Sequence, residues 1–336
     1  MSTIHVGIIG VGRIGHVHYL NLSQMPNVSI DYMCDLLADD SWADKYPAGG
    51  RFVTDYHEIL ADPAIDAVLI CVPTDLHPQV IIDAAEAGKH IFCEKPVGFD
   101  NDQILAAYHA VKKAGVYFQT GFNRRQEKNF RRIVEARDAG QLGKPEVLKV
   151  TSRDPEPPSY DYVKRSGGLF KDMMIHDFDI VRFISGEEVR TVRAMGAALV
   201  DPHVGELGDV DTAIVTLEFA SGMLGVIDNS RRAAYGYDQR IELFGSKGVA
   251  VCGNNHESET VVATADGVRR DLPLHFFLER YKEAYRLETE KFFDVVANGG
   301  EIECTFEDGI KAVRLAEAAL ESLNNGGAAV EVKPIE

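Results

Sequence analysis

The sequence predicts an α/β fold class: an N-terminal Rossmann dinucleotide-binding domain followed by a C-terminal α+β domain with an open, mostly antiparallel sheet. Short apolar runs alternate with amphipathic stretches up to residue 120, and a glycine-rich loop follows the first run. Beyond that point the pattern changes to long alternating runs. We therefore expect two domains, residues 1–121 and 122–336, joined by a compact turn, with a closing helix able to pack back on the first domain.

The first domain alternates strands and helices. This alternation implies parallel strand pairing and right-handed crossovers, as in doubly wound sheets. The expected strands are residues 4–9, 28–34, 67–72, 90–93 and 116–119, and the clearest helices are residues 76–87 and 100–114.

The second domain contains long runs of period two, separated by turn sequences such as Ser221-Gly222 and Asp266-Gly267 that favour antiparallel hairpins. The expected strands are residues 147–152, 191–199, 211–219, 223–229, 240–244, 249–252 and 260–264. The expected helices are residues 127–139, 172–184, 276–297 and 306–324, the last two of which could pack on either domain.

Composition narrows the class of protein. The 336 residues are 45% hydrophobic and 26% charged, which is ordinary for a folded domain. The net charge of -17 favours solubility and offers no basic patch for nucleic acid or an anionic membrane. The five cysteines are odd in number and widely spaced, as in a reducing compartment. We expect a cytoplasmic protein with a small-molecule substrate and without nucleic-acid or membrane partners.

A glycine-rich loop at residues 10–15 provides the strongest motif. Gly10, Gly12 and Gly15 have the G-x-G-x-x-G spacing directly after a strand and at the start of a helix. Asp35 ends the second expected strand, where a carboxylate accepts from both ribose hydroxyls and repels a 2'-phosphate. The motif therefore predicts NAD as cofactor rather than NADP.

Further cofactor contacts are expected where other strands end. Pro73 turns the chain out of the sheet after the expected strand at residues 67–72, although a simple strand-ending turn would have the same sequence. The complete set of expected cofactor-binding residues is Gly10, Gly12, Arg13, Ile14, Gly15, Asp35, Pro73, Thr74, His77 and Glu94.

Two clusters carry the candidate chemistry. Lys95 comes just after the expected strand at residues 90–93 and precedes Pro96, at the sheet edge where ligands bind in open α/β folds. Asp172, His176 and Asp179 would form one polar stripe on a helix. The alternatives are a solvated lysine and an ordinary pair of side chains one helical turn apart. The chain lacks further His or Cys at metal spacing, so no metal is expected.

This set suits oxidation of a secondary alcohol. Such a reaction needs a base for the hydroxyl proton, and histidine suits this role because its unperturbed pKa is about 6.5, which makes His176 the candidate base. Lys95 can stabilise the developing alkoxide, and Asp172 can orient the imidazole or contact the lysine. The expected catalytic residues are Lys95, Asp172 and His176. Polyol-binding candidates, besides these three, are Asn123, Arg124, Arg125, Asp154, Asp179 and Tyr235.

These motifs resemble the glucose-fructose oxidoreductase and inositol dehydrogenase (GFO/IDH/MocA) family over essentially the whole chain. The resemblance is carried by residues 10–15, by Glu94-Lys95-Pro96, and by Gly167-Gly168 leading into Asp172-x-x-x-His176. The segments 121–125, 152–155, 167–179 and 235–240 look most like a myo-inositol 2-dehydrogenase. One departure is Glu127-Lys128, where relatives more often carry a Phe-Asp-Pro-like stretch.

The resemblance implies specific properties. It implies an NAD cofactor, conversion of myo-inositol to scyllo-inosose in inositol catabolism, proton transfer by Lys95 and His176, and a cis peptide between Lys95 and Pro96. It also implies a homotetramer joined through the open sheets. Two alternatives stay open: a dehydrogenase for scyllo- or chiro-inositol or a pyranose such as glucose, and a catalytically inactive NAD- or sugar-binding regulator.

Overall fold

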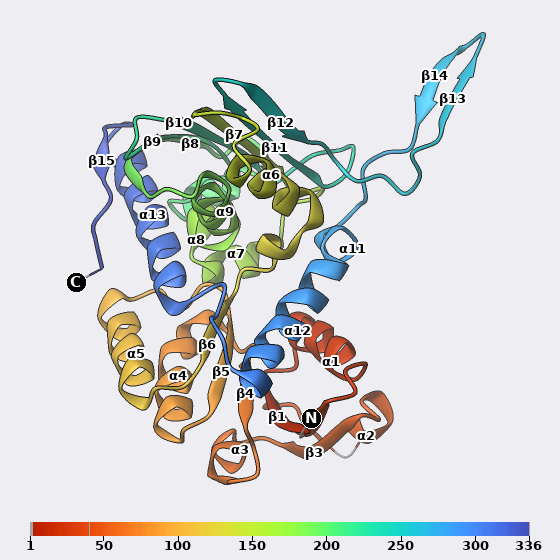
Figure 1. The fold of residues 1–336 in the computed structure, drawn as a ribbon, viewed down its shortest axis with the longest axis vertical. Helices are drawn as coiled ribbons and strands as arrows, with labels where there is room; N and C mark the ends of the chain where they lie inside the picture. Colours follow the sequence, from red (N-terminus) through yellow and green to blue (C-terminus); the bar gives the residue numbers. More distant parts are fainter. Residues whose placement is uncertain (1–2, 40, 336) are drawn as a thin grey trace. The chain divides into compact units, whose positions relative to one another are not determined.

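A computed structural model describes residues 3–39 and 41–335 (Figure 1). The chain forms two compact units, one containing residues 1–123 and 283–310 and the other containing residues 124–282 and 311–336. Within residues 3–39 and 41–335, no helix is both long enough and apolar enough to cross a bilayer.

The first unit contains a six-stranded parallel sheet in the order β3-β2-β1-β4-β5-β6, the order of a doubly wound dinucleotide-binding fold. This confirms the predicted Rossmann architecture. The edge strand β3 has no counterpart in the prediction, because Gly49-Gly50 interrupts any apolar run and little of the strand is buried. The strands are β1 (Ile4–Ile9), β2 (Val28–Cys34), β3 (Gly49–Val53), β4 (Ala67–Ile70), β5 (His90–Glu94) and β6 (Phe118–Gly121).

Helices cover both faces of this sheet, with α4 and α5 on one face and α1 and α12 on the other (Figure 1). The helix α5 has clear end signals: the Asp100 carboxylate accepts from the Gln103 backbone N–H, and Gly115 ends the helix with a φ of +69°. Phe292 and Phe293 of α12 pack into the core of the unit. The helices are α1 (Arg13–Leu22), α2 (Trp42–Lys45), α3 (His57–Ala61), η1 (Thr74–Leu76), α4 (His77–Glu86), α5 (Asn101–Ala114) and α12 (Lys282–Asn298).

The second unit contains a seven-stranded sheet in the order β12-β11-β7-β10-β9-β8-β15. Only the β7–β10 pairing is parallel among the described strands of this sheet, which confirms the prediction of an open, mostly antiparallel sheet. The hairpin β13–β14 belongs to a separate two-stranded sheet and extends away from the main one (Figure 1). The strands are β7 (Pro145–Arg153), β8 (Val189–Ala197), β9 (Thr212–Phe219), β10 (Leu224–Ser230), β11 (Asp238–Gly245), β12 (Gly248–Cys252), β13 (Val261–Thr264), β14 (Gly267–Arg270) and β15 (Val330–Glu331).

Burial alternates along the strands of this sheet, so one face packs on helices and the other is exposed. The sequence departure at Glu127 has a local role: its carboxylate accepts from the N–H groups of Asn129 and Phe130 and starts α6. The helices are η2 (Asn123–Gln126), α6 (Lys128–Asp138), α7 (Tyr160–Ser166), α8 (Gly168–Asp172), α9 (Ile175–Ser185), α10 (Pro202–Glu206), α11 (Phe277–Arg280) and α13 (Phe306–Asn324), whose first residues belong to the first unit.

Candidate functional site

The glycine-rich loop joins β1 to α1, and each of its glycines has a separate steric reason. Gly10 has a φ of +91°, and a Cβ there would lie 2.6 Å from the Cys71 carbonyl carbon. A Cβ on Gly15 would lie 2.0 Å from the Gly10 carbonyl oxygen, so glycine alone lets the helix start so close to the strand. A Cβ on Gly12 would meet nothing within 4 Å, which leaves open space over its backbone. The loop thus has the tight turn and exposed backbone that a pyrophosphate requires.

Asp35 lies beside this loop because backbone donors hold its carboxylate there. It accepts from the Val11 N–H at 2.9 Å and from the Leu37 N–H at 3.1 Å. Arg13 and Ile14 form the first turn of α1, where backbone N–H groups lack partners within the helix. The open backbone at Gly12 and the fixed carboxylate of Asp35 together fit NAD: the loop would hold the pyrophosphate and Asp35 the adenosine ribose.

The turns after β4 and β5 are tied together by His77, which is buried at the start of α4. Its Nδ1 lies 2.7 Å from the Pro96 carbonyl oxygen and its Nε2 lies 2.9 Å from the Val72 carbonyl oxygen. Burial lowers the pKa of His77, and the two carbonyls act against that shift. Since the protein engages both ring nitrogens, the cofactor contact expected of His77 stays a prediction. Pro73 is exposed and Thr74 half-buried at this turn.

Lys95 is half-buried in the turn after β5, and the Lys95–Pro96 peptide is cis, which confirms the expectation drawn from the family resemblance. The preceding Glu94 is buried, and its carboxylate accepts from His18 Nε2 at 2.7 Å. His18 lies on α1, so the helix that follows the glycine loop also fixes the side chain next to Lys95.

In the second unit, one buried cation holds two of the predicted acids. Arg231 Nη2 donates to Asp172 at 2.8 Å, and its Nη1 donates to Asp154 at 3.4 Å. Tyr162 also donates to Asp172, at 2.8 Å. Burial raises the pKa of Asp154, and Arg231 opposes that rise. Sequence reasoning missed Arg231. Two acids expected in one pocket need a positively charged partner, and Arg231 could have been considered for that role because it directly follows an expected strand.

The expectation of one helix carrying Asp172, His176 and Asp179 is wrong. The helix is interrupted, because α8 ends at Asp172 and α9 begins at Ile175. The backbone N–H groups of Met173 and Met174 both bond to the Leu169 carbonyl, at 3.1 and 2.9 Å, and this wider turn interrupts the α-helical ladder. His176 is half-buried in the first turn of α9.

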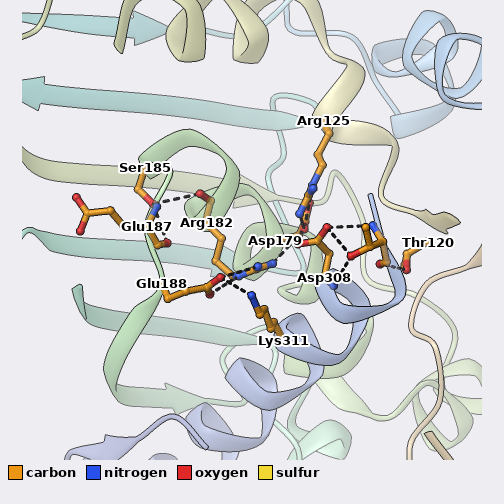
Figure 2. A network of polar contacts seen from close by, with 10 residues as sticks. Thr120, Arg125, Asp179, Arg182, Ser185, Glu187, Glu188, Asp308 and Lys311 are labelled. Atoms are coloured by element: carbon orange, nitrogen blue, oxygen red, sulfur yellow. Dashed lines mark hydrogen bonds and ion pairs between the residues drawn. The ribbon is translucent and has the colours of Figure 1, made fainter. Parts of the chain in front are cut away.

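Asp179 and Arg125, both predicted to contact substrate, bind each other (Figure 2). Arg125 Nε and Nη2 lie 2.9 and 2.6 Å from Asp179 oxygens, and the carboxylate is fully buried. Figure 2 shows the network continuing through Arg182 to Glu188, which Lys311 also contacts at 2.7 Å. A direct substrate contact by either residue stays a prediction, and it would require this buried pair to open.

A second buried network was missed by sequence reasoning. Arg124 donates to Asp177 at 2.6 Å and to the Tyr237 hydroxyl at 3.2 Å. Asn229 donates to the other Asp177 oxygen at 3.0 Å. Burial raises the pKa of Asp177, and Arg124 opposes that rise. This network anchors η2 and α9 to the sheet, and it gives Arg124 a structural partner rather than an open side chain.

Two further predicted substrate contacts lie apart from these networks. Tyr235 is partly exposed and donates to Asp238 at 2.5 Å, while Arg153 donates to the tyrosine hydroxyl at 3.3 Å. The amide of Asn123 is buried, and its Nδ2 has no hydrogen-bond partner in the described part of the chain. Both side chains remain predicted substrate contacts.

A doubly wound sheet with this glycine loop and an acid after its second strand defines a dinucleotide-binding protein. Residues 4–122 match the model of the oxidoreductase family with an NAD-binding Rossmann fold, and residues 130–251 match the GFO/IDH/MocA C-terminal domain. The chain belongs to the GFO/IDH/MocA family, and its first unit is an NAD-binding domain.

Relatives match along nearly the whole chain. An uncharacterised oxidoreductase of Bacillus subtilis is 51% identical over 326 residues, covering 96% of this chain and 95% of the relative. The myo-inositol 2-dehydrogenase of Thermotoga maritima is 46% identical over 321 residues, covering 95% of this chain and 96% of the relative. The inositol 2-dehydrogenase of Rhizobium meliloti is 44% identical over 324 residues, covering 96% and 97%.

Solved structures give the same picture. The myo-inositol dehydrogenase of Corynebacterium glutamicum matches with a TM-score of 0.93 and 35% identity, covering 99% of this chain and 100% of that one. The scyllo-inositol dehydrogenase of Lactobacillus casei, solved with bound NAD(H) and scyllo-inositol, matches with a TM-score of 0.91 and 29% identity, covering 98% of each chain. The predicted family and fold are therefore confirmed.

Proposed function

We propose that the protein is an NAD-dependent inositol 2-dehydrogenase that oxidises myo-inositol to scyllo-inosose. The observation that carries the proposal is the glycine loop with Asp35 fixed beside it, on a chain of which 95% and 96% match two named inositol dehydrogenases. The second unit adds Asp154, Asp172 and His176, polar groups that suit a substrate with several hydroxyls.

We propose Lys95, Asp172 and His176 as the catalytic residues. NAD, when bound, supplies the hydride acceptor. His176 takes the hydroxyl proton, Lys95 stabilises the negative charge that develops on oxygen, and Asp172, held by Tyr162 and Arg231, contributes a fixed carboxylate. Asn123, Asp154 and Tyr235 are the proposed hydroxyl-binding residues, and substrate contacts by Arg125 and Asp179 stay part of the proposal.

The decisive experiment measures steady-state rates with purified enzyme on myo-, scyllo- and chiro-inositol and on glucose, each with NAD and NADP. We expect the highest kcat/KM for myo-inositol with NAD. A preference for scyllo-inositol is the second candidate, because one matched structure holds that ligand. Absence of turnover on every polyol would favour an NAD- or sugar-binding regulator, and a His176→Ala variant with undiminished biological function would support that alternative.

We also propose that the enzyme is a homotetramer that works in the cytoplasm in inositol catabolism. The main sheet of the second unit exposes one face on which large apolar side chains lie among charged ones, and packing it against a second copy would remove the apolar side chains from water. Its exposed large side chains include Met195, Ile214, Leu224, Phe244 and Val251. Sedimentation of the wild type and of Ile214→Glu tests the association; a tetramer unaffected by that charge would refute this interface.

A further inference from the structure

A buried cluster of three titratable side chains lies next to the Lys95 turn, and none of the three takes part in the proposed proton or hydride transfer. It consists of His18 on α1, Glu94 at the end of β5 and Glu288 on α12. One ligand atom from each residue lies within 4.8 Å of the other two. The three residues are 0%, 7% and 2% exposed, so water does not screen their charges.

The hydrogen bonds within the cluster are unevenly shared. Glu94 is satisfied by His18 Nε2 at 2.7 Å. By contrast, neither carboxyl oxygen of Glu288 has a hydrogen-bond partner among the described residues, although the Glu288 backbone carbonyl accepts from Gln119 at 3.0 Å and fixes this turn of α12. A buried carboxylate without any donor is the most costly state of this side chain.

Two forms of the cluster would remove that cost: a proton on Glu288 or a bound cation. A metal-ligating histidine almost always donates its second ring nitrogen to a partner, which fixes the ring. The Nδ1 of His18 is buried and has no such partner within the described residues. The ring instead packs between Phe92 and Tyr285, with centroids 5.0 and 6.1 Å away. These contacts favour the proton.

We propose that Glu288 is a neutral carboxylic acid in the folded enzyme, and that its stored proton keeps Glu94 paired with His18 and so holds the end of β5 that leads into Lys95. With two carboxylates this close and both buried, one must stay protonated. Burial, then the charge of Glu94, raises the pKa of Glu288 well above its usual value. The Cys71 thiol also interacts with both Glu94 and Glu288, and a thiol supplies no positive charge to offset theirs.

The proposal predicts the direction of a pH effect. Glu288 is ionised in the unfolded chain and protonated in the folded chain, so folding takes up a proton. Its stabilising contribution is complete below the unfolded pKa, near 4.5, and is lost as the pH rises toward the raised folded value. Glu288→Gln keeps the shape of the acid and cannot ionise. The wild-type Tm should therefore fall more steeply than that of Glu288→Gln between about pH 6 and about pH 9.

The matched control is Glu301→Gln, a change at an exposed carboxylate of the same unit, which should follow the wild type at every pH. Infrared spectroscopy of the wild type should show the carbonyl band of a protonated carboxyl group at neutral pH. Glu288→Gln should lack that band, and Glu301→Gln should retain it. A wild-type spectrum without this band would refute the protonated acid even if a substitution prevents folding.

A kinetic experiment, which rests on the proposed dehydrogenase activity, tests whether Glu288 helps to position Lys95. Glu288→Gln should keep kcat within about twofold of wild type, whereas Glu288→Met, which has no group to face Glu94, should lower kcat more than it raises the KM for the polyol. Parallel Tm profiles or a missing carboxyl band would overturn the proposal. So would a stoichiometric divalent metal in the purified enzyme that Glu288→Gln loses. A wild type inactive on all polyols would refute the proposed function alone.

Discussion

Replacing Arg231 with methionine should destabilise the second unit strongly. The side chain is buried and is the shared hydrogen-bond donor to Asp172 at 2.8 Å and Asp154 at 3.4 Å. Methionine matches the length of the aliphatic stem but leaves both carboxylates without their cation. Breaking a buried ion pair by removing one partner costs about 3–5 kcal/mol. We expect a loss of that size in the free energy of unfolding near pH 7, measured by urea denaturation.

The size of the loss should depend on pH. Burial already raises the pKa of Asp154 above its usual 3.8, and removing Arg231 removes the main effect that opposes this rise. A carboxyl group whose pKa is higher in the folded state than in the unfolded chain stabilises the fold fully at pH values below its unfolded pKa. This stabilisation declines as the pH rises above that value. The deficit of Arg231→Met should thus grow from about pH 5 to about pH 8, by at most about 1.4 kcal/mol per pH unit for each proton bound.

Arg232→Met is the matched control, because Arg232 is the neighbouring residue and is exposed. It should change stability by no more than about 0.5 kcal/mol. If Arg231→Met lost less than about 1 kcal/mol, or if its deficit were the same at both pH values, the reasoning that Arg231 balances two buried acids would be refuted.

Three further outcomes are expected. Asp35→Ser should lower kcat/KM with NAD by about 10- to 150-fold, because a charged hydrogen-bond acceptor contributes about 1.5–3 kcal/mol, and it should weaken discrimination against NADP. An unchanged preference for NAD over NADP in steady-state kinetics would count against Asp35 as the ribose-binding residue. Lys95→Ala should lower kcat by orders of magnitude, and a change confined to KM would make Lys95 a binding residue. Burial alone would raise the pKa of Glu188, but hydrogen bonds from Arg182 and Lys311 lower it to about 2. Because Glu188 is half-exposed, Glu188→Gln should lower the free energy of unfolding by only about 1 kcal/mol at pH 7. This loss should shrink as the pH falls from about 4.5 toward 2. A difference in urea unfolding that does not change with pH would contradict this reasoning.

Local sequence signals were sufficient for the nucleotide-binding half. The glycine spacing, the strand before it and the acid at Asp35 are all set by short-range sterics and hydrogen bonds, and such constraints can be read along the chain. The helix α5 is a similar case, since Asp100 and Gly115 mark its two ends in the sequence. By contrast, β3 is an edge strand with little apolar content, so periodicity gave no signal for it.

The polar networks of the second unit could not be read in the same way. A periodic stripe placed Asp172, His176 and Asp179 on one helix, yet the shared Leu169 carbonyl divides that helix in two. Arg125, which binds Asp179, is 54 positions away from it in sequence, and Arg231, which binds Asp172, is 59 positions away. Pairing across such distances depends on which side chains the folded core brings together.

The sequence by itself determined the fold class and the NAD-binding loop, because each follows from patterns that are read along continuous stretches of the chain. Only the tertiary structure decided which charges neutralise one another: Arg231 with Asp154 and Asp172, Arg125 with Asp179, and Glu94 with His18 beside Glu288. The physical reason is that a buried charge must find a partner wherever the fold supplies one, and that choice is made in space.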